Sequence, residues 1–155
     1  MIQRIQSVFL LLTTILAGLF LTGEIFKFAD SKDSEFLMNM SGIFRIGAER
    51  ELLPVMKTLP LLILSLLIPV VSLISIFLFK KRKIQLKVIL MLFLLNLLLI
   101  GIAAFYGISF MSRNQLSLLP RFEMFIPLIN IILIILAWRG IKNDEDLVRS
   151  YDRLR

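Results

Sequence analysis

Residues suited to acid–base or nucleophilic chemistry are scarce in this chain. Its 155 residues include no Cys and no His, which removes thiolate catalysis, disulfide bonds, the commonest general base and the usual ligands of zinc, haem and copper. Ser65, Ser72 and Ser75 have no charged neighbour in the sequence that would activate a hydroxyl group. We therefore predict that the protein is not an enzyme and that it has no metal and no other cofactor.

Charged side chains at the ends of apolar segments leave one enzymatic alternative open, a site that acts on lipid head groups at a membrane surface. The residues concerned are Asp30, Arg113, Arg121 and Glu123. They form no recognisable pair of nucleophile and base, so this alternative ranks third, behind the two hypotheses given below.

Four small or polar side chains interrupt apolar segments at matching depths, and they are Thr13, Ser72, Asn96 and Asn130. Each lies about eight residues from one end of its segment, which is about 10 to 12 Å of helix. The spacing therefore predicts a polar layer across the helices. Such side chains most simply hold helices together, and a hydrogen bond between Asn96 and Asn130 would contribute about 0.6 to 2 kcal/mol. A site for a polar solute or proton is the alternative, although no acidic or basic residue joins the layer.

Five cations, which we call the basic cluster, separate two of the longest apolar segments: Lys80, Lys81, Arg82, Lys83 and Lys87. A cation at the centre of a bilayer costs about 2.5 to 3.5 kcal/mol, so the basic cluster is predicted to lie at a membrane surface. Because cytoplasmic loops carry an excess of Lys and Arg, the basic cluster and the basic C-terminal segment predict that both termini are cytoplasmic. The basic cluster can also contact anionic lipid head groups.

The composition and the apolar blocks predict an all-α membrane protein. Hydrophobic residues make up 58% of the chain, against about 45 to 50% in soluble domains. The net charge of +7 indicates topology rather than nucleic-acid binding, because the basic residues flank apolar segments. We expect a single domain, residues 1–155, in which four transmembrane helices form an antiparallel bundle. The predicted spans are residues 5–23, 59–79, 88–111 and 120–138.

Two details of these spans need an argument. The first span is too long for a cleaved export signal and lacks the usual cleavage pattern, so we expect it to be retained. The fourth span must begin at Pro120, which suits the first turn of a helix, if it is to cross the bilayer. Pro127 would then bend this helix, and Trp138 with Arg139 would anchor it at the interface.

The segments outside the spans are an outer loop, residues 24–57, and a cytoplasmic tail, residues 139–155. Within the loop, Ile25–Ala29 and Gly42–Ile46 suit a short hairpin or an interfacial flap, but the periodicity predicts no definite fold. Asn143 and Asp146 have the spacing of a capping box, which predicts a short amphipathic helix from about Asp144 to Leu154. Its candidate docking residues are Leu147, Val148, Arg149, Tyr151, Arg153 and Leu154.

Small residues on the third span, Gly101, Ala103, Ala104 and Gly107, allow another helix to approach closely, either in the same chain or in a second protein. Both ends of the sequence, Met1 to Gln6 and Arg139 to Arg155, resemble a family of uncharacterised four-span inner-membrane proteins of Bacteroidota. The resemblance implies a bacterial inner membrane and supplies no activity or site. Because it rests partly on the tail, it favours the tail as a docking element.

Two hypotheses of function follow. The first is a non-enzymatic accessory or scaffold subunit that docks to a larger envelope assembly through the tail, although the tail helix can equally pack on its own bundle. The second is a small oligomeric transporter or channel that uses the polar layer. The expected partners are membrane lipids and either a membrane protein or a second copy of the chain, with no nucleic acid. The expected location is the bacterial inner membrane, with both termini in the cytoplasm.

Overall fold

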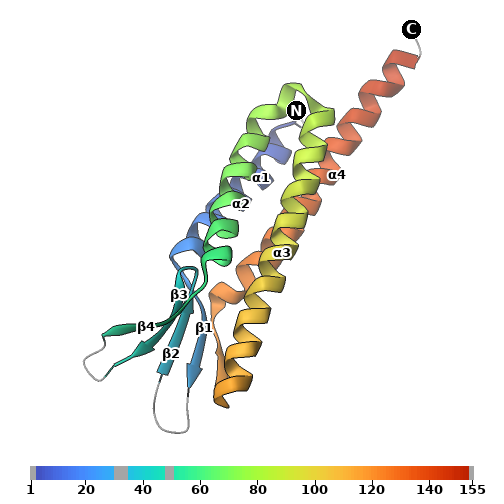
Figure 1. Ribbon diagram of the computed structural model, residues 1–155. Helices are drawn as coiled ribbons and strands as arrows, with labels where there is room; N and C mark the ends of the chain where they lie inside the picture. Colours follow the sequence, from blue (N-terminus) through green and yellow to red (C-terminus); the bar gives the residue numbers. More distant parts are fainter. Residues whose placement is uncertain (1–2, 30–34, 48–50, 154–155) are drawn as a thin grey trace.

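A computed structural model of the protein describes residues 3–29, 35–47 and 51–153. Within these residues, four helices are long and apolar enough to cross a membrane. They are α1 (Gln3–Thr22), α2 (Leu59–Phe77), α3 (Arg82–Asn114) and α4 (Ile126–Arg153). Helices α1 and α3 each pack against both α2 and α4. The first residues of α1 and the last residues of α4 lie at the same end of the protein (Figure 1).

The opposite end of the protein is a five-stranded antiparallel sheet, so the prediction of an all-α bundle is wrong. The strands are β1 (Glu24–Ala29), β2 (Glu35–Asn39), β3 (Gly42–Ile46), β4 (Leu52–Lys57) and β5 (Ser117–Pro120). Their order across the sheet is β4-β3-β2-β1-β5. Four strands come from the predicted outer loop, and the fifth comes from the segment between the predicted third and fourth spans, with Pro120 as its last residue (Figure 1).

The local sequence explains why the strands were hard to recognise. A register shift between Glu24 and Phe26 disturbs the alternation of β1, and every described residue of β4 is exposed, so β4 has no buried face. The clearest signal is the β2–β3 turn, where Asn39 Oδ1 accepts hydrogen bonds from the backbone N–H groups of Ser41 and Gly42, both at 3.0 Å. Side-chain acceptance of this kind is typical of Asn in turns.

One face of the sheet packs on the C-terminal half of α3. The ring centroid of Phe110 lies 5.6 Å from that of Phe28 and 5.5 Å from that of Phe36. A Cβ atom added to Gly107 would lie 2.9 Å from the ring of Phe26. Gly107 was expected to allow a close approach between helices. It instead allows the sheet to pack closely on α3.

The length of α3 explains how one helix serves both ends of the protein. Its 33 residues correspond to about 50 Å at 1.5 Å per residue, whereas the hydrocarbon core of a bilayer is about 30 Å thick. The helix begins within the basic cluster at Arg82 and ends at Asn114, followed by Gln115 in the left-handed conformation with a φ of 52°. A short 3-10 helix, η1 (Leu78–Lys80), joins α2 to this start.

The fourth span begins differently from the prediction. Pro120 is the last residue of β5, and a 3-10 helix, η2 (Phe122–Phe125), precedes α4. Pro127 is the second residue of α4, where its missing N–H group has no intrahelical partner to lose. The expectation of a proline bend is therefore wrong, because the helix starts at Ile126, six residues later than the sequence suggested.

The predicted amphipathic tail helix is not a separate element either. Helix α4 runs from Ile126 to Arg153 without interruption and passes through Trp138 and Arg139, the residues expected to anchor it at the interface. Gly140, which would favour an end to the helix, instead lets α1 approach, since a Cβ atom at that position would lie 2.8 Å from Gln6 Cγ. The tail is helical as predicted, but as a continuation of the fourth span.

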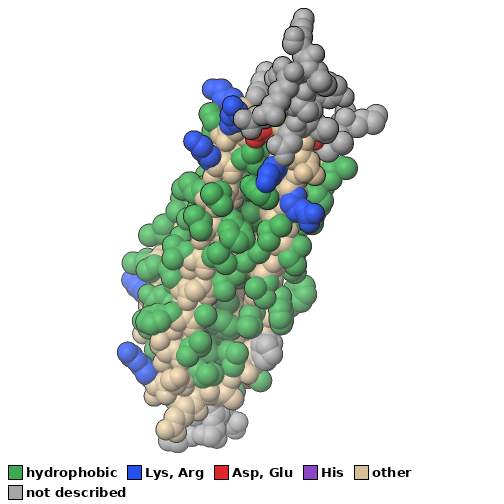
Figure 2. Space-filling model, turned by 90° about the vertical axis from the view of Figure 1, so that its right-hand side faces the viewer, with side chains coloured by type: hydrophobic (Ala, Val, Ile, Leu, Met, Phe, Trp, Pro, Cys, Tyr) green, Lys and Arg blue, Asp and Glu red, His purple; other side chains and the backbone are tan. Residues whose placement is uncertain are grey.

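The outer surface of the helices is apolar over most of its length. Figure 2 shows hydrophobic side chains covering this face, with Lys and Arg side chains towards its ends. Exposed apolar residues occur on all four helices, and examples are Leu11, Ile15, Leu66, Val70, Leu94, Leu98 and Ile132. A patch of this extent on a protein surface marks contact with a membrane or another protein.

Candidate functional site

The structure buries all four residues of the predicted polar layer between the helices. Thr13, Ser72 and Asn96 are completely buried, and Asn130 is 3% exposed. Ser72 Oγ donates a hydrogen bond to the backbone carbonyl of Leu10 at 2.9 Å and so joins α2 to α1. Thr13 Oγ1 donates to the carbonyl of Phe9, one turn earlier on its own helix, also at 2.9 Å. The two hydroxyl residues are therefore satisfied by backbone groups.

The amides of the layer are not satisfied in the same way. Neither Nδ2 nor Oδ1 of Asn96 has a hydrogen-bond partner among the described residues, and the same holds for Oδ1 of Asn130. The expected hydrogen bond between Asn96 and Asn130 is therefore not formed. An unpaired buried polar group costs about 1 to 3 kcal/mol, so these amides are the part of the layer that packing alone does not explain.

A second buried polar group lies near the helix ends away from the sheet, and sequence reasoning missed it. Gln6 on α1 is 7% exposed and Asp144 on α4 is 8% exposed. Gln6 Nε2 donates a hydrogen bond to Asp144 Oδ2 at 2.7 Å, and Arg82 Nη1 donates to the backbone carbonyl of Asp144 at 3.0 Å. These contacts join α1, α3 and α4. The sequence held one signal for this group. Gln6 in the N-terminal segment and Asp144 in the C-terminal segment are polar residues that lie, by helical spacing, on the apolar face of their helices.

A neighbouring contact closes the turn between α2 and α3. Gln85, which is 4% exposed, donates a hydrogen bond from Nε2 to the backbone carbonyl of Ser75 at 2.9 Å. Ser75 Oγ is buried and has no hydrogen-bond partner among the described residues. Ser65 Oγ donates to the carbonyl of Leu62 at 2.8 Å. The serines considered as nucleophiles are thus buried between the helices, and none of these contacts supplies a base.

The residues of the basic cluster do not all behave alike. Lys81, Lys83 and Lys87 are exposed. Arg82 is half-buried and turns its guanidinium group towards α4, where it donates to Asp144. Arg82 is therefore part of the helix packing, and the exposed lysines carry the surface charge at this end. The side chain of Lys80 lies outside the described part of the structure.

The docking residues predicted for the tail lie near the end of α4. Leu147, Val148, Arg149, Tyr151 and Arg153 belong to this helix, and Leu154 lies outside the described residues. These residues follow directly after the part of α4 that packs inside the protein. Asp144, the last buried residue described on α4, precedes Leu147 by less than one turn.

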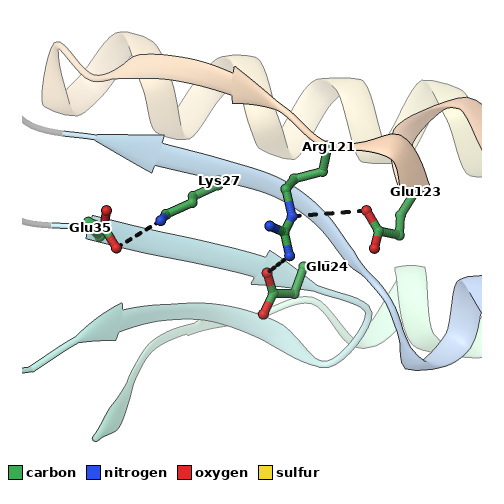
Figure 3. Close-up of polar contacts among 5 residues, drawn as sticks. All are labelled: Glu24, Lys27, Glu35, Arg121 and Glu123. Atoms are coloured by element: carbon green, nitrogen blue, oxygen red, sulfur yellow. Dashed lines mark hydrogen bonds and ion pairs between the residues drawn. The ribbon is translucent and has the colours of Figure 1, made fainter. Parts of the chain in front are cut away.

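The charged residues at the sheet end form ion pairs, as Figure 3 shows. Arg121 Nη2 lies 2.7 Å from Glu24 Oε2, and Arg121 Nε lies 4.0 Å from Glu123 Oε2. Lys27 Nζ lies 2.9 Å from Glu35 Oε2. All five side chains are at least one-quarter exposed, so each pair contributes about 0 to 1 kcal/mol. These pairs join β1 to β2 and to the segment after β5.

Of the other charges considered for head-group chemistry, Arg113 lies beside a shallow groove between β4 and α3. Asp30 lies outside the described residues. Within the described part of the chain, no group of three or more acidic side chains gathers in the way that metal ligands do.

Together these features define a class of protein: four long helices, apolar enough to cross a membrane, with an antiparallel sheet at one end. The chain belongs to the family described as Domain of unknown function (DUF4293), whose model matches residues 2–154. The resemblance to an uncharacterised family is thereby confirmed. No curated protein matches the chain.

Proposed function

We propose that this protein is a non-enzymatic subunit of the bacterial inner membrane, an accessory or scaffold component that docks to a larger envelope assembly through the cytoplasmic end of α4. The observation that carries the proposal is the unbroken course of α4 to Arg153. The helix projects past the start of α1 and past the turn between α2 and α3 (Figure 1). After Glu145 it continues for about 12 Å at 1.5 Å per residue. A rigid projecting helix suits a docking element.

The pattern of α4 supports this assignment. One face of the helix packs inside the protein, and its buried residues are Asn130, Ile134, Ala137, Ile141 and Asp144. Steps of four and three residues lead from Asp144 to Val148 and Tyr151, and residues with this spacing lie on one face of a helix. The row that packs within the protein therefore continues into the projecting segment, where a partner helix or groove would extend the same packing.

The membrane location and its direction rest on charge. The exposed lysines of the basic cluster, Lys81, Lys83 and Lys87, lie at the same end as both ends of the described chain, and the ion-paired sheet lies at the other. By the positive-inside rule, the basic end is cytoplasmic and the sheet lies on the opposite side. The resemblance to inner-membrane proteins of Bacteroidota supports the location, and the direction rests on the charge alone.

The orientation is testable because the chain has no Cys. Single variants Lys57→Cys on β4 and Arg149→Cys on α4 are expressed in cells. The outer membrane is then removed, and the inner membrane is left intact. A maleimide that does not cross membranes should label Lys57→Cys in intact cells and should label Arg149→Cys only after permeabilisation. The opposite pattern would invert the proposed direction, and equal labelling of both variants in intact cells would contradict a membrane-spanning arrangement.

The docking role is tested by gentle solubilisation and affinity capture of the full-length protein from its native membrane. The variant Val148→Glu/Tyr151→Glu places charge on the projecting row and should lose the proteins captured with the wild-type chain. Ser150→Glu, on a different face of the same turn of α4, is the matched control and should retain them. Identical sets of captured proteins for all three chains would reject docking through the tail.

A second candidate function, a small oligomeric transporter or channel, is favoured by one observation, the unpartnered amide of Asn96. A polar solute that passes between the helices would satisfy its Nδ2 and Oδ1 atoms. The test is flux in liposomes that contain the purified protein, first with a panel of small polar solutes and then with a proton gradient. Flux that is abolished in Asn96→Leu but kept in Ser72→Ala would favour transport over docking.

A further inference from the structure

A groove on the outside of the helices separates α3 from α4 close to the basic end. It is lined by Ile89, Leu90, Phe93, Ile134, Ile135 and Trp138. Its volume is about 230 Å³, which is below the roughly 300 to 1,000 Å³ of sites that enclose a whole small molecule. Since every lining residue is apolar apart from the indole N–H of Trp138, the groove suits part of one hydrocarbon chain.

Both helices carry lysines close to the groove, on the side towards the basic end. On α3, Lys87 precedes Leu90 by three residues, and Lys83 precedes Lys87 by four, so the three residues form one row. On α4, Lys142 follows Trp138 by four residues, and its Nζ atom lies 4.9 Å from the centroid of the indole ring. Because α3 starts and α4 leaves the other helices at the same end (Figure 1), Lys87 and Lys142 each lie about one turn from a lining residue, on the side of the groove towards that end.

Among the residues whose side chains the structure describes, no acidic group forms an ion pair with Lys83, Lys87 or Lys142. The first turn of α3 has no acidic residue. Asp144 is buried and accepts its hydrogen bond from Gln6 on the inner side of α4, and Glu145 is half-buried. Lys83, Lys87 and Lys142 are all exposed. The groove therefore has exposed lysines and an aromatic ring towards one end, the combination that suits the level where a lipid head group meets its chains.

We propose that the groove between α3 and α4 binds an anionic phospholipid, with part of one acyl chain along Leu90, Phe93 and Ile135 and the phosphate group at Lys87 and Lys142. The inference rests on the proposed membrane location but is independent of docking through the tail. The two lysines contribute charge, and Trp138 fixes the position of the lipid between head group and chain. A zwitterionic phospholipid fills the groove but gains less from the lysines.

The experiment uses the full-length protein in non-ionic detergent and measures bound phospholipid by native mass spectrometry. The probes are dioleoyl phosphatidylglycerol and dioleoyl phosphatidylcholine, which have the same chains and differ in charge. Phosphatidylglycerol should bind more tightly to the wild-type protein. The variant Lys87→Gln/Lys142→Gln should lose this preference, with affinity about fivefold weaker for each cation removed. The matched control Lys57→Gln/Arg113→Gln removes the same charge at the sheet end and should bind like the wild type.

The groove itself is tested by filling it. Leu90→Trp, at a residue that is 55% exposed, should weaken the binding of both lipids, whereas Met91→Trp, equally exposed but not in the groove, should not. Equal affinity of the wild-type protein for the two lipids, or equal loss in the lysine variant and its control, would show annular lipid only and overturn the proposal. Failure to bind either lipid would also overturn the proposal, whereas the maleimide labelling tests the membrane location and the tail variants test docking.

Discussion

The helical region and the sheet region arrange polar and apolar side chains in opposite ways. In the helical region, large apolar residues such as Leu94 and Ile132 are more than half exposed, while Thr13, Ser72 and Asn96 are completely buried. In the sheet region, Phe28, Met38 and Ile43 are completely buried and the ion pairs lie outside. The contrast agrees with the proposed membrane location, in which lipid surrounds the helices and water surrounds the sheet. Helix α3 belongs to both.

Strand β4 is the exception within the sheet. It forms one edge of the sheet, and Leu52, Leu53, Val55 and Met56 are each 44 to 53% exposed. An exposed apolar edge strand normally invites pairing with another chain. Only Met56, close to the C-terminal end of β4, lines a groove together with Tyr106 and Phe110 of α3.

The largest expected effect comes from a substitution in the apolar core of the sheet region. Phe28→Ala removes a completely buried ring that packs on Phe110, and it should lower the free energy of unfolding by about 3 to 5 kcal/mol. The control Phe105→Ala removes a ring that is 68% exposed on the same helix as Phe110 and should change stability by less than about 0.5 kcal/mol. Thermal unfolding in detergent measures both. Similar losses would mean that the sheet does not depend on this core.

The next effect concerns the buried polar group at the basic end. Gln6→Leu leaves Asp144 Oδ2 without its donor, and loss of a buried hydrogen bond to a charged group should cost about 1.5 to 3 kcal/mol. Gln85→Leu removes a hydrogen bond to a neutral carbonyl group and should cost about 1 kcal/mol. Chemical unfolding of both variants gives the comparison. If Gln85→Leu proves the more harmful, Gln6 does not hold α1 to α4.

Two glycines of α3 sharpen the division between the regions. Gly107 lies against the Phe26 ring, so Gly107→Ala brings a Cβ atom to 2.9 Å from it and should cost about 1 to 3 kcal/mol. Gly101 has nothing within 4 Å of the same added atom, and Gly101→Ala should stabilise the helix by about 0.5 to 1 kcal/mol. Opposite signs in thermal unfolding are expected. A loss in both variants would mean that the whole small face is packed.

The smallest expected effect concerns the polar residues buried between the helices. Asn96→Leu replaces an amide that has no hydrogen-bond partner among the described residues, so it should leave stability unchanged or raise it by about 1 kcal/mol. Ser72→Ala removes the hydrogen bond to Leu10 and should lower stability by about 1 kcal/mol. A large loss in Asn96→Leu, measured by thermal unfolding, would show that the amide holds the helices together after all.

The sequence predicted the helical region well and the sheet region poorly. Length and apolarity locate four helices without reference to the rest of the chain, and the polar residues Thr13, Ser72, Asn96 and Asn130 were recognised as buried because they interrupt apolar segments. In contrast, Pro120, the last residue of β5, was assigned to a helix because proline suits a helix start as well as a strand end.

The candidate site shows the same limit. The basic cluster was recognised from its charge, but the separate role of Arg82 depends on Asp144, which is 62 residues later in the chain. The groove between α3 and α4 is also formed by residues that lie more than 40 positions apart. Contacts of this kind carry no local pattern, so only the packing of the helices reveals them.

The sequence by itself therefore determined the four apolar helices and the concentration of positive charge at Lys80 to Lys87, because composition and spacing along one segment are sufficient for both. Tertiary structure alone decided the sheet, the late start of α4 and its unbroken course through Gly140 to Arg153. The physical reason is that strand pairing joins residues such as Phe28 and Leu118, which are 90 positions apart in the chain, and the backbone groups of a strand are satisfied only when its neighbouring strands are in place. Similarly, a helix can end or continue at a glycine according to the neighbour that packs there.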